Sequence, residues 1–510
     1  MIRKYVLLSI SLFAVGAFAR IPEKNVAIVS GSEDYEFVET PRGIQVKNVI
    51  KHEYEATRRA ETVQPHVFYN DVISLDKASG GSAKYKNVNS PTVFHDDSKV
   101  CYFDIHLAQK GKKAKVEFRR TWKDASHLSK IVLGEDYPIK SKSVRVKIPA
   151  SMQGIKLVDL NFPENGIIRT DAVEPDGSRM VTYALTDVRP MVSEPSDPPL
   201  LRSEPVVIVT GYFPEVDSLY RWHHALTLVD TDIPDAEALL SEICGYAKER
   251  MAKISSIYRW VQRNIRYVAY EEGEAGFRPD TPVEVVRKRY GDCKGMALLL
   301  TTLLNKVGID AYPASVGTRD IPFDIVEMPC LAATDHMVCV VPVDGDTLVL
   351  DATNEYIPVG HTPFSIQGKD MLVDKGDEYR LYTAPVLEAS VSTDSIGYEF
   401  EIADGVLSGI AVRQVSGDMK EFFMGMYDNV KKHLQPEFLM RSLSPSAKIG
   451  VAEGSVAFDV DSDEGATATL SGRLTVPEAV VDGGGSWFVD LNTSGDAFTD
   501  RVDTDGRIYD

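Results

Sequence analysis

The chain has 510 residues, of which 44% are hydrophobic and 26% are charged. This length predicts roughly two to four domains, and the composition excludes wholesale disorder. The formal net charge of −19 excludes nucleic acid and anionic membranes as favoured partners, because both are also negatively charged.

Residues 1–19 have the features of a secretory signal peptide. Arg3 and Lys4 precede an apolar stretch, and Ala17-Phe18-Ala19 supplies a small-x-small cleavage site. The apolar stretch is short for a bilayer span, which disfavours an uncleaved anchor. We predict cleavage after Ala19 and export across the inner membrane to the periplasm, or alternatively to the cell surface, without stable membrane insertion.

Residues 20–215 show many short segments in which apolar and polar side chains alternate. Examples of these segments are AKVEFRRTW, KSVRVKIP, RMVTYAL and PVVIVTGYF. A period of two with Val, Ile, Tyr and Phe predicts strands. Many short strands separated by polar turns predict a β-sandwich-like N-terminal domain, with an open barrel as the alternative.

Residues 216–383 combine helical and strand patterns and predict a central α+β domain. An amphipathic helix is indicated by apolar residues at helical spacing, namely Ile254, Ile257, Tyr258, Val261 and Ile265. Pro282 marks the first turn of a second helix. The third helix should be buried, because Met296 to Val307 is apolar on most faces; Asp292 is its expected N-cap and Gly308 its end.

Three strand-like segments follow the third helix: IDAYPASVG, HMVCVVPV and TLVLDAT. Asp344-Gly345 predicts a hairpin between the last two. If these two residues form the turn, Val343 faces Asp346, and Asp351 lies on the same face as His336 in a diagonal position. A register shifted by one residue would place the two side chains on opposite faces.

Residues 384–510 are again strand-like and predict a small, mostly β C-terminal domain. The segment GDMKEFFMGMYDNVKKHL interrupts the strand pattern and predicts a helical insert. The chain ends in DRVDTDGRIYD, which has no obvious closing strand.

Cys293 is the most chemically suggestive of the five cysteines, whose irregular spacing predicts neither a zinc site nor a dense disulfide framework. It lies at a predicted helix start, where free backbone N–H groups and the helix dipole lower a thiol pKa and can stabilise an oxyanion. His336 and Asp351 are the candidate imidazole partner and orienting carboxylate. The alternative is that Cys293 is an inert buried thiol.

Three further features are given roles outside the proposed chemistry: Cys339, the pair His223-His224 and the loop Thr318 to Asp335. Cys339 lies an odd number of positions from His336, so we expect it on the opposite face of the strand, in the core. We expect His223-His224 to be a surface or packing pair, because no third metal ligand is suitably spaced. From its position alone, the loop Thr318 to Asp335 is a candidate lid.

RYGDCKGMALLLTTLLNKVGIDAYPASVGTR and DHMVCVVPVDGDTLVLDATNEYIPVG resemble the core of transglutaminase-like proteins, and IYRWVQRNIRYV resembles the helix and strand before their nucleophile. The resemblance covers about residues 230–374. It implies a papain-like central domain with Cys293, His336 and Asp351 as a catalytic triad. A β-rich domain before this core and a smaller one after it resemble the arrangement of exported bacterial members. Gly295 departs from the family, whose members often carry an acidic or larger residue there.

The resemblance implies an exported enzyme with a cysteine nucleophile, a peptidase or amidase that forms a thioester acyl-enzyme. We expect its substrate to be a peptide, isopeptide or peptidoglycan-like amide, with no cofactor or metal. The oligomeric state is not indicated. Two alternatives stay open: a protein-crosslinking transglutaminase, and a non-catalytic binding or scaffold protein of the cell envelope.

Overall fold

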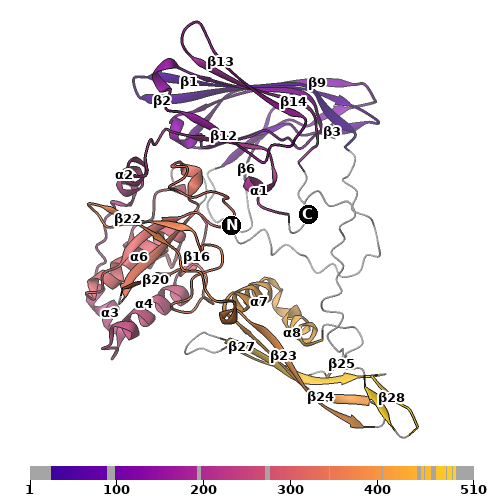
Figure 1. Cartoon of the computed structure of the whole chain (residues 1–510), viewed down its shortest axis with the longest axis vertical. Coiled ribbons are helices and arrows are strands. Elements are labelled where there is room, and N and C mark those ends of the chain that lie inside the picture. The colour runs from indigo at the N-terminus through magenta and orange to yellow at the C-terminus, as the bar shows by residue number, and fades with distance from the viewer. Residues whose placement is uncertain are drawn as a thin grey trace.

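The computed structural model describes residues 24–88, 98–191, 197–269, 276–343, 345–403, 406–444, 450–452, 454–460, 467–477, 479–484 and 486–489. The predicted signal peptide, the turn residue Asp344 and the C-terminal end lie outside the described residues. The fold is multidomain, with a β-rich N-terminal unit, a central α+β unit and a β-rich C-terminal unit (Figure 1).

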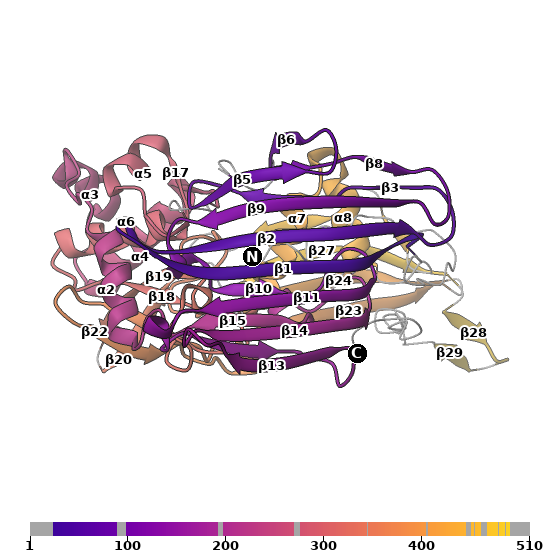
Figure 2. The same ribbon diagram turned by 90° about the horizontal axis from the view of Figure 1, so that it is seen from above.

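The N-terminal unit is built on a seven-stranded sheet (Figure 2). Its strands, in spatial order, are β13 (Ile167–Val173), β14 (Arg179–Val188), β11 (Ile139–Ile148), β1 (Val26–Thr40), β2 (Gly43–Ala56), β9 (Lys113–Trp122) and β5 (Ile73–Ser79). A three-stranded sheet consists of β10 (Lys130–Val132), β15 (Val206–Thr210) and β12 (Lys156–Leu160). Shorter strands form two further small sheets, β3 (Glu61–Val63) with β8 (Ile105–Leu107), and β4 (His66–Tyr69) with β7 (Lys99–Tyr102) and β6 (Lys84–Asn87).

One apolar core joins the two larger sheets of this unit. It contains Val144 and Tyr183 from the large sheet together with Ile131, Leu157 and Val209 from the three-stranded sheet. Burial alternates along β11, as the period-two pattern predicts. Two sheets packed through a shared core form a sandwich-like unit.

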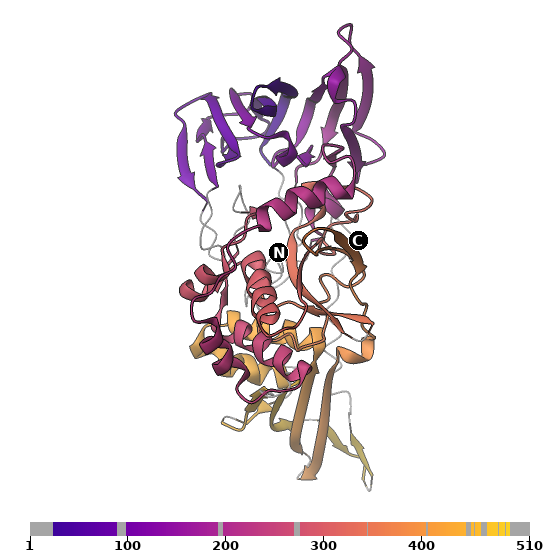
Figure 3. The same cartoon turned by 90° about the vertical axis from the view of Figure 1, so that its left-hand side faces the viewer.

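The central unit places helices beside a five-stranded sheet (Figure 3). The sheet order is β20 (Asp346–Leu350), β19 (His336–Val343), β18 (Tyr312–Val316), β21 (Asp370–Asp374) and β22 (Tyr379–Thr383). The helices are α2 (Val216–Thr227), α3 (Ala236–Cys244), α4 (Arg250–Asn264), α5 (Pro282–Lys288) and α6 (Cys293–Lys306), preceded by the short α1 (Leu200–Ser203). The two-residue strands β16 (Arg266–Tyr267) and β17 (Tyr290–Gly291) pair in parallel.

The three predicted helices of the central unit are confirmed. Helix α4 buries its predicted apolar face, and α5 has Pro282 in its first turn. Helix α6 is buried on nearly all sides, and its side chains share a core with Cys339 of β19. Helix α2 was not predicted, although Leu219, Tyr220 and His223 form a buried stripe at helical spacing.

The C-terminal unit has a sheet covered by two helices. Its strands are β23 (Asp394–Ala403), β24 (Val406–Ser416), β27 (Thr467–Val476), β25 (Gly450–Val451) and β26 (Ala457–Val460), followed by the pair β28 (Val480–Asp482) and β29 (Trp487–Val489). The helices are α7 (Gly417–Asn429), which confirms the predicted insert, and α8 (Gln435–Leu443). They pack on the sheet through Phe423, Met424 and Leu439. In the part of the chain described, helices are too short or too polar to span a membrane.

Candidate active site

Cys293 is the first residue of α6. The preceding strand β17 pairs with β16, which fixes the backbone up to Gly291. Asp292 is the N-cap, as predicted, and its carboxylate accepts a hydrogen bond of 2.8 Å from the Gly295 N–H. The thiol of Cys293 is partly exposed. It therefore lies at the positive end of a helix and within reach of solvent.

His336 and Asp351 lie on the two strands of the predicted hairpin. Val343 pairs with Asp346 and Cys339 pairs with Leu350, so the predicted register is confirmed. Nε2 of His336 donates to Oδ2 of Asp351 over 2.8 Å. Because the register keeps both side chains on one face, the imidazole and the carboxylate meet directly.

Asp351 is buried, with 3% of its surface exposed, and is held by neighbours. Its Oδ1 accepts hydrogen bonds from the Thr353 N–H at 3.1 Å and the Thr353 hydroxyl at 2.7 Å. The hydroxyl of Tyr258 donates to the backbone carbonyl of Asp351 at 2.8 Å. Burial raises the pKa of the Asp351 carboxyl, but the charge of His336 and the hydrogen bonds from His336 and Thr353 outweigh burial and lower the pKa.

The other side of the His336 ring faces Cys293. Burial would lower the pKa of His336, but the charge and hydrogen bond of Asp351, with a hydrogen bond to the Cys293 thiol, raise this pKa well above its ordinary value. Nε2 is occupied by Asp351, so Nδ1 is the nitrogen left for the thiol. The structure thus brings together all three residues that the sequence singled out.

The remaining four cysteines have different surroundings from Cys293. Burial raises the pKa of all four thiols, that of Cys330 to about 11 and that of Cys339 to about 12. Cys339 packs against Thr301 of α6, on the opposite face from His336, as predicted. A thiol with a raised pKa is mostly protonated at neutral pH and is a weak nucleophile.

Sequence reasoning did not single out Thr353, Lys294 or the hydroxyl of Tyr258. Thr353 was detectable, because an Asp followed two residues later by Thr is typical of a side chain that hydrogen-bonds its own turn. Lys294 forms a buried ion pair with Asp292 beside Cys293. The contact of Tyr258 with Asp351 spans 93 positions, so no local pattern could predict it.

The loop Thr318 to Asp335, considered above as a lid, is anchored in the molecule. Its side chains Ile321, Phe323 and Ile325 are buried in a cluster with residues of β15 and α2. The ammonium of Lys369 donates to the backbone carbonyls of Ile321 and Phe323. Movement of this loop would expose these apolar side chains, so it is not a free flap.

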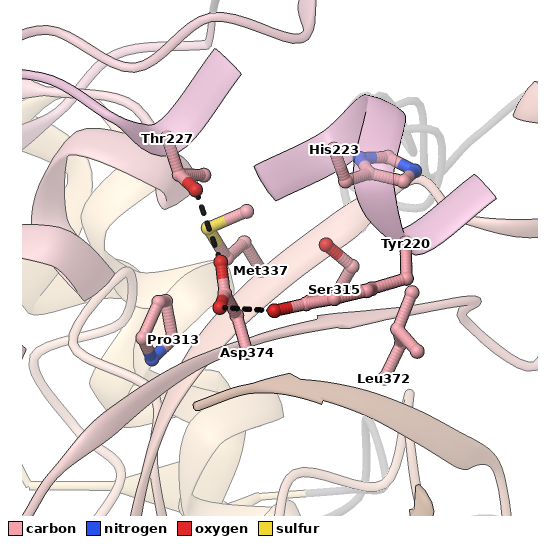
Figure 4. A pocket seen from close by; sticks show the side chains of 8 residues that line it. All are labelled: Tyr220, His223, Thr227, Pro313, Ser315, Met337, Leu372 and Asp374. Atoms are coloured by element: carbon pink, nitrogen blue, oxygen red, sulfur yellow. Dashed lines mark hydrogen bonds between the residues drawn. The ribbon is translucent and has the colours of Figure 1, made fainter. Parts of the chain in front are cut away.

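His223 and His224 lie on α2, and His223 lines a pocket of about 10 Å³ (Figure 4). The ring of His223 packs against Trp222 and Phe277, and burial lowers its pKa to about 4. Nδ1 of His224 donates to Asp374 over 2.8 Å. The packing role predicted for this pair is confirmed, and the pocket has room for about one water molecule.

Comparisons with known proteins find a family match for part of the central unit. Residues 237–321 match the model of the Transglutaminase-like superfamily, a range that includes Cys293 and ends before His336. No curated protein matches the chain in sequence. Among solved structures, the chain is similar to a candidate protease from Parabacteroides distasonis, with 13% identity, a TM-score of 0.54, and coverage of 92% of this chain and 96% of that one.

Two further solved structures match more weakly. One is a candidate cysteine protease from Cytophaga hutchinsonii, with 10% identity, a TM-score of 0.19, and coverage of 61% of this chain and 76% of that one. The other is an M1 zinc metallopeptidase from Deinococcus radiodurans, with 9% identity, a TM-score of 0.20, and coverage of 56% and 64%. Of the three, the Parabacteroides protein therefore shares the fold of this chain.

Proposed function

We propose that the protein is an exported cysteine-nucleophile hydrolase, a proposal supported by the match of residues 237–321 to the Transglutaminase-like superfamily. Its substrate is a peptide, isopeptide or peptidoglycan-like amide. The observation that carries the proposal is the hydrogen bond of 2.8 Å between His336 and Asp351, with the thiol of Cys293 on the other side of the same ring.

In the proposed first half-reaction, the Cys293 thiolate attacks the amide carbonyl carbon. The negative charge that develops on the carbonyl oxygen is stabilised by backbone N–H groups at the start of α6. The C–N bond then breaks, and the His336 imidazolium gives its Nδ1 proton to the leaving amine. A thioester between the substrate acyl group and Cys293 remains.

In the second half-reaction, neutral His336 removes a proton from water, which attacks the thioester. The C–S bond breaks, the carboxylic acid leaves, and the thiolate–imidazolium pair is restored. Asp351 keeps Nε2 protonated through both steps, so Nδ1 is always the nitrogen that exchanges the proton.

Product analysis tests this function. Peptide, isopeptide and peptidoglycan-fragment libraries are incubated with wild type and Cys293→Ala, with and without a primary amine, and the products are read by mass spectrometry. We expect a new carboxylic acid from wild type alone, whether or not the amine is present. A new amide formed with the amine would instead identify a crosslinking transglutaminase. Equal products from both proteins would contradict a Cys293 nucleophile.

A further inference from the structure

The segment after Asp351, which we call the acid loop (residues 351–364), is held by α4 of the central unit. Besides its bond to Asp351, the Tyr258 hydroxyl donates to the Ile357 carbonyl at 3.2 Å. The Gln262 amide donates to the carbonyls of Asn354 at 2.8 Å and Ile357 at 2.9 Å. These contacts fix one side of the loop.

The opposite side of the acid loop meets helix α7 of the C-terminal unit, which lies next to the central unit (Figure 1). Oδ1 of Asp418 accepts hydrogen bonds from Nε2 of His361 at 2.9 Å and from the Phe364 N–H at 3.2 Å. The hydroxyl of Tyr356 donates to Asp428 at 2.6 Å. The loop that carries Asp351 is therefore clamped between two domains.

The orientation of Asp418 is itself fixed by the C-terminal unit. Its Oδ2 accepts a hydrogen bond of 3.0 Å from the Ser392 hydroxyl, and the backbone N–H of Asp418 donates to the hydroxyl oxygen of Ser392 over 3.0 Å. Because both carboxylate oxygens accept hydrogen bonds, the position of the helix that carries Asp418 determines where its bonding partners lie. Asp418 thus couples the placement of α7 to that of the acid loop.

Glu421 lies one helical turn after Asp418 on α7, and it is a second residue of this helix that interacts with the acid loop. Burial, the charge of Asp351 and the charge of Asp418 raise the pKa of Glu421 to about 7, against a hydrogen bond from Asn354 that lowers it. An electrostatic effect of Asp351 on a residue of α7 means that the helix lies close to the site.

We propose that Asp418 is a positioning residue for the reaction, and that α7 of the C-terminal unit completes the support of Asp351. The inference rests on the proposed function, because Asp351 matters only if it orients His336. When Asp418 loses its charge, the acid loop loosens, the hydrogen bond that His336 donates to Asp351 weakens, and less of Cys293 is thiolate.

The test uses the full chain and needs no substrate. The rate of iodoacetamide labelling of Cys293 is measured against pH by peptide mapping, together with thermal unfolding, for wild type, Asp418→Asn, Asp394→Asn and His336→Ala. Asp394→Asn is the matched control: Asp394 binds Arg413 inside the C-terminal unit, and its side chain is 26% exposed, against 21% for Asp418.

We expect Asp418→Asn to lower the labelling rate at pH 7 roughly tenfold, the lower end of the effects seen when an outer supporting partner of a functional side chain is lost. Asp394→Asn should lower the unfolding temperature but keep the wild-type labelling profile. The inference is overturned if Asp418→Asn labels like wild type, or if both variants shift equally. If His336→Ala leaves labelling unchanged, the proposed thiolate–imidazole pair fails, and the inference falls with it.

Discussion

Two His–Asp pairs of the central unit have nearly the same local geometry but different neighbours. His336 donates to Asp351 and His224 donates to Asp374, each over 2.8 Å. Only the ring of His336 has a thiol on its other side, whereas Asp374 also accepts from Thr227 and Tyr220 beneath α2 (Figure 4). An imidazole–carboxylate pair therefore defines a candidate site only when a nucleophile lies beside the same ring.

The largest expected difference between the two His–Asp pairs is in the turnover rate that remains after Asp351→Asn or Asp374→Asn. An Asn at 351 can no longer hold the imidazole in the required tautomer, so we expect the turnover rate of an amide substrate to fall roughly a thousandfold or more. Asp374→Asn should keep the rate within about twofold of wild type. Steady-state kinetics of the two purified variants provide the measurement, and similar losses in both would remove the distinction between the pairs.

The second difference is the stabilising effect of the His336–Asp351 pair and its dependence on pH. The pKa of Asp351 is lowered from 3.8, so its contribution is present above pH 3.8 and is lost as pH falls further. The pKa of His336 is raised above 6.5, so its contribution is complete below pH 6.5 and is lost as pH rises through the raised value.

His336→Ala should therefore lower the free energy of unfolding most at about pH 5, by roughly 3 kcal/mol, because it leaves a buried carboxylate unpaired. The difference from wild type should shrink well above pH 6.5. Urea unfolding at several pH values measures it, with His224→Ala as the control. A destabilisation that grows with increasing pH would have the wrong sign.

A third difference concerns Glu421 of α7, on which the charge of Asp351 acts. Its pKa is raised from 4.5 to about 7, so wild type is fully stabilised below pH 4.5 and loses stability as pH rises through about 7. Glu421→Gln should be more stable than wild type at pH 8 by roughly 2 kcal/mol and similar at pH 4.5. Glu437→Gln on α8, where the side chain is 50% exposed, is the control, and thermal unfolding at both pH values is the readout.

The smallest expected effect compares two threonine hydroxyls that bind the two carboxylates. Thr353 donates to Asp351 at 2.7 Å and Thr227 donates to Asp374 at 3.1 Å. Thr353→Val and Thr227→Val should each cost about 1 kcal/mol of stability. Only Thr353→Val should raise the pH midpoint of Cys293 labelling. An equal shift in both variants would show that the labelling midpoint of Cys293 responds to any loss of stability in the protein and not to the hydrogen bonding of Asp351.

The sequence predicted the helix and the strands that carry the site residues, but it did not predict the contacts that hold these residues in place. The hairpin register followed from the Asp344-Gly345 turn, because a two-residue turn fixes every pair that follows. Likewise, Asp292 before an apolar run predicted where α6 begins. These are local rules, and they were sufficient to bring His336 and Asp351 together.

The contacts that hold the acid loop could not be predicted in this way. Asp418 meets His361 across 57 positions, and Tyr258 meets Asp351 across 93. Such contacts depend on how separately folded units pack, which no period or turn signal encodes. The lid hypothesis for residues 318–335 did not include the burial of their apolar side chains. Position in the chain does not reveal which apolar side chains pack against another unit.

The most direct test of the proposed Cys293–His336 pair is the pH dependence of iodoacetamide labelling of Cys293 in wild type, His336→Ala and His224→Ala. We predict that wild type and His224→Ala share a midpoint below the value of about 8.5 for a free thiol, and that His336→Ala raises it. If Cys293 labelled like the other four thiols in all three proteins, that result would contradict a thiolate–imidazole pair and favour a non-catalytic scaffold.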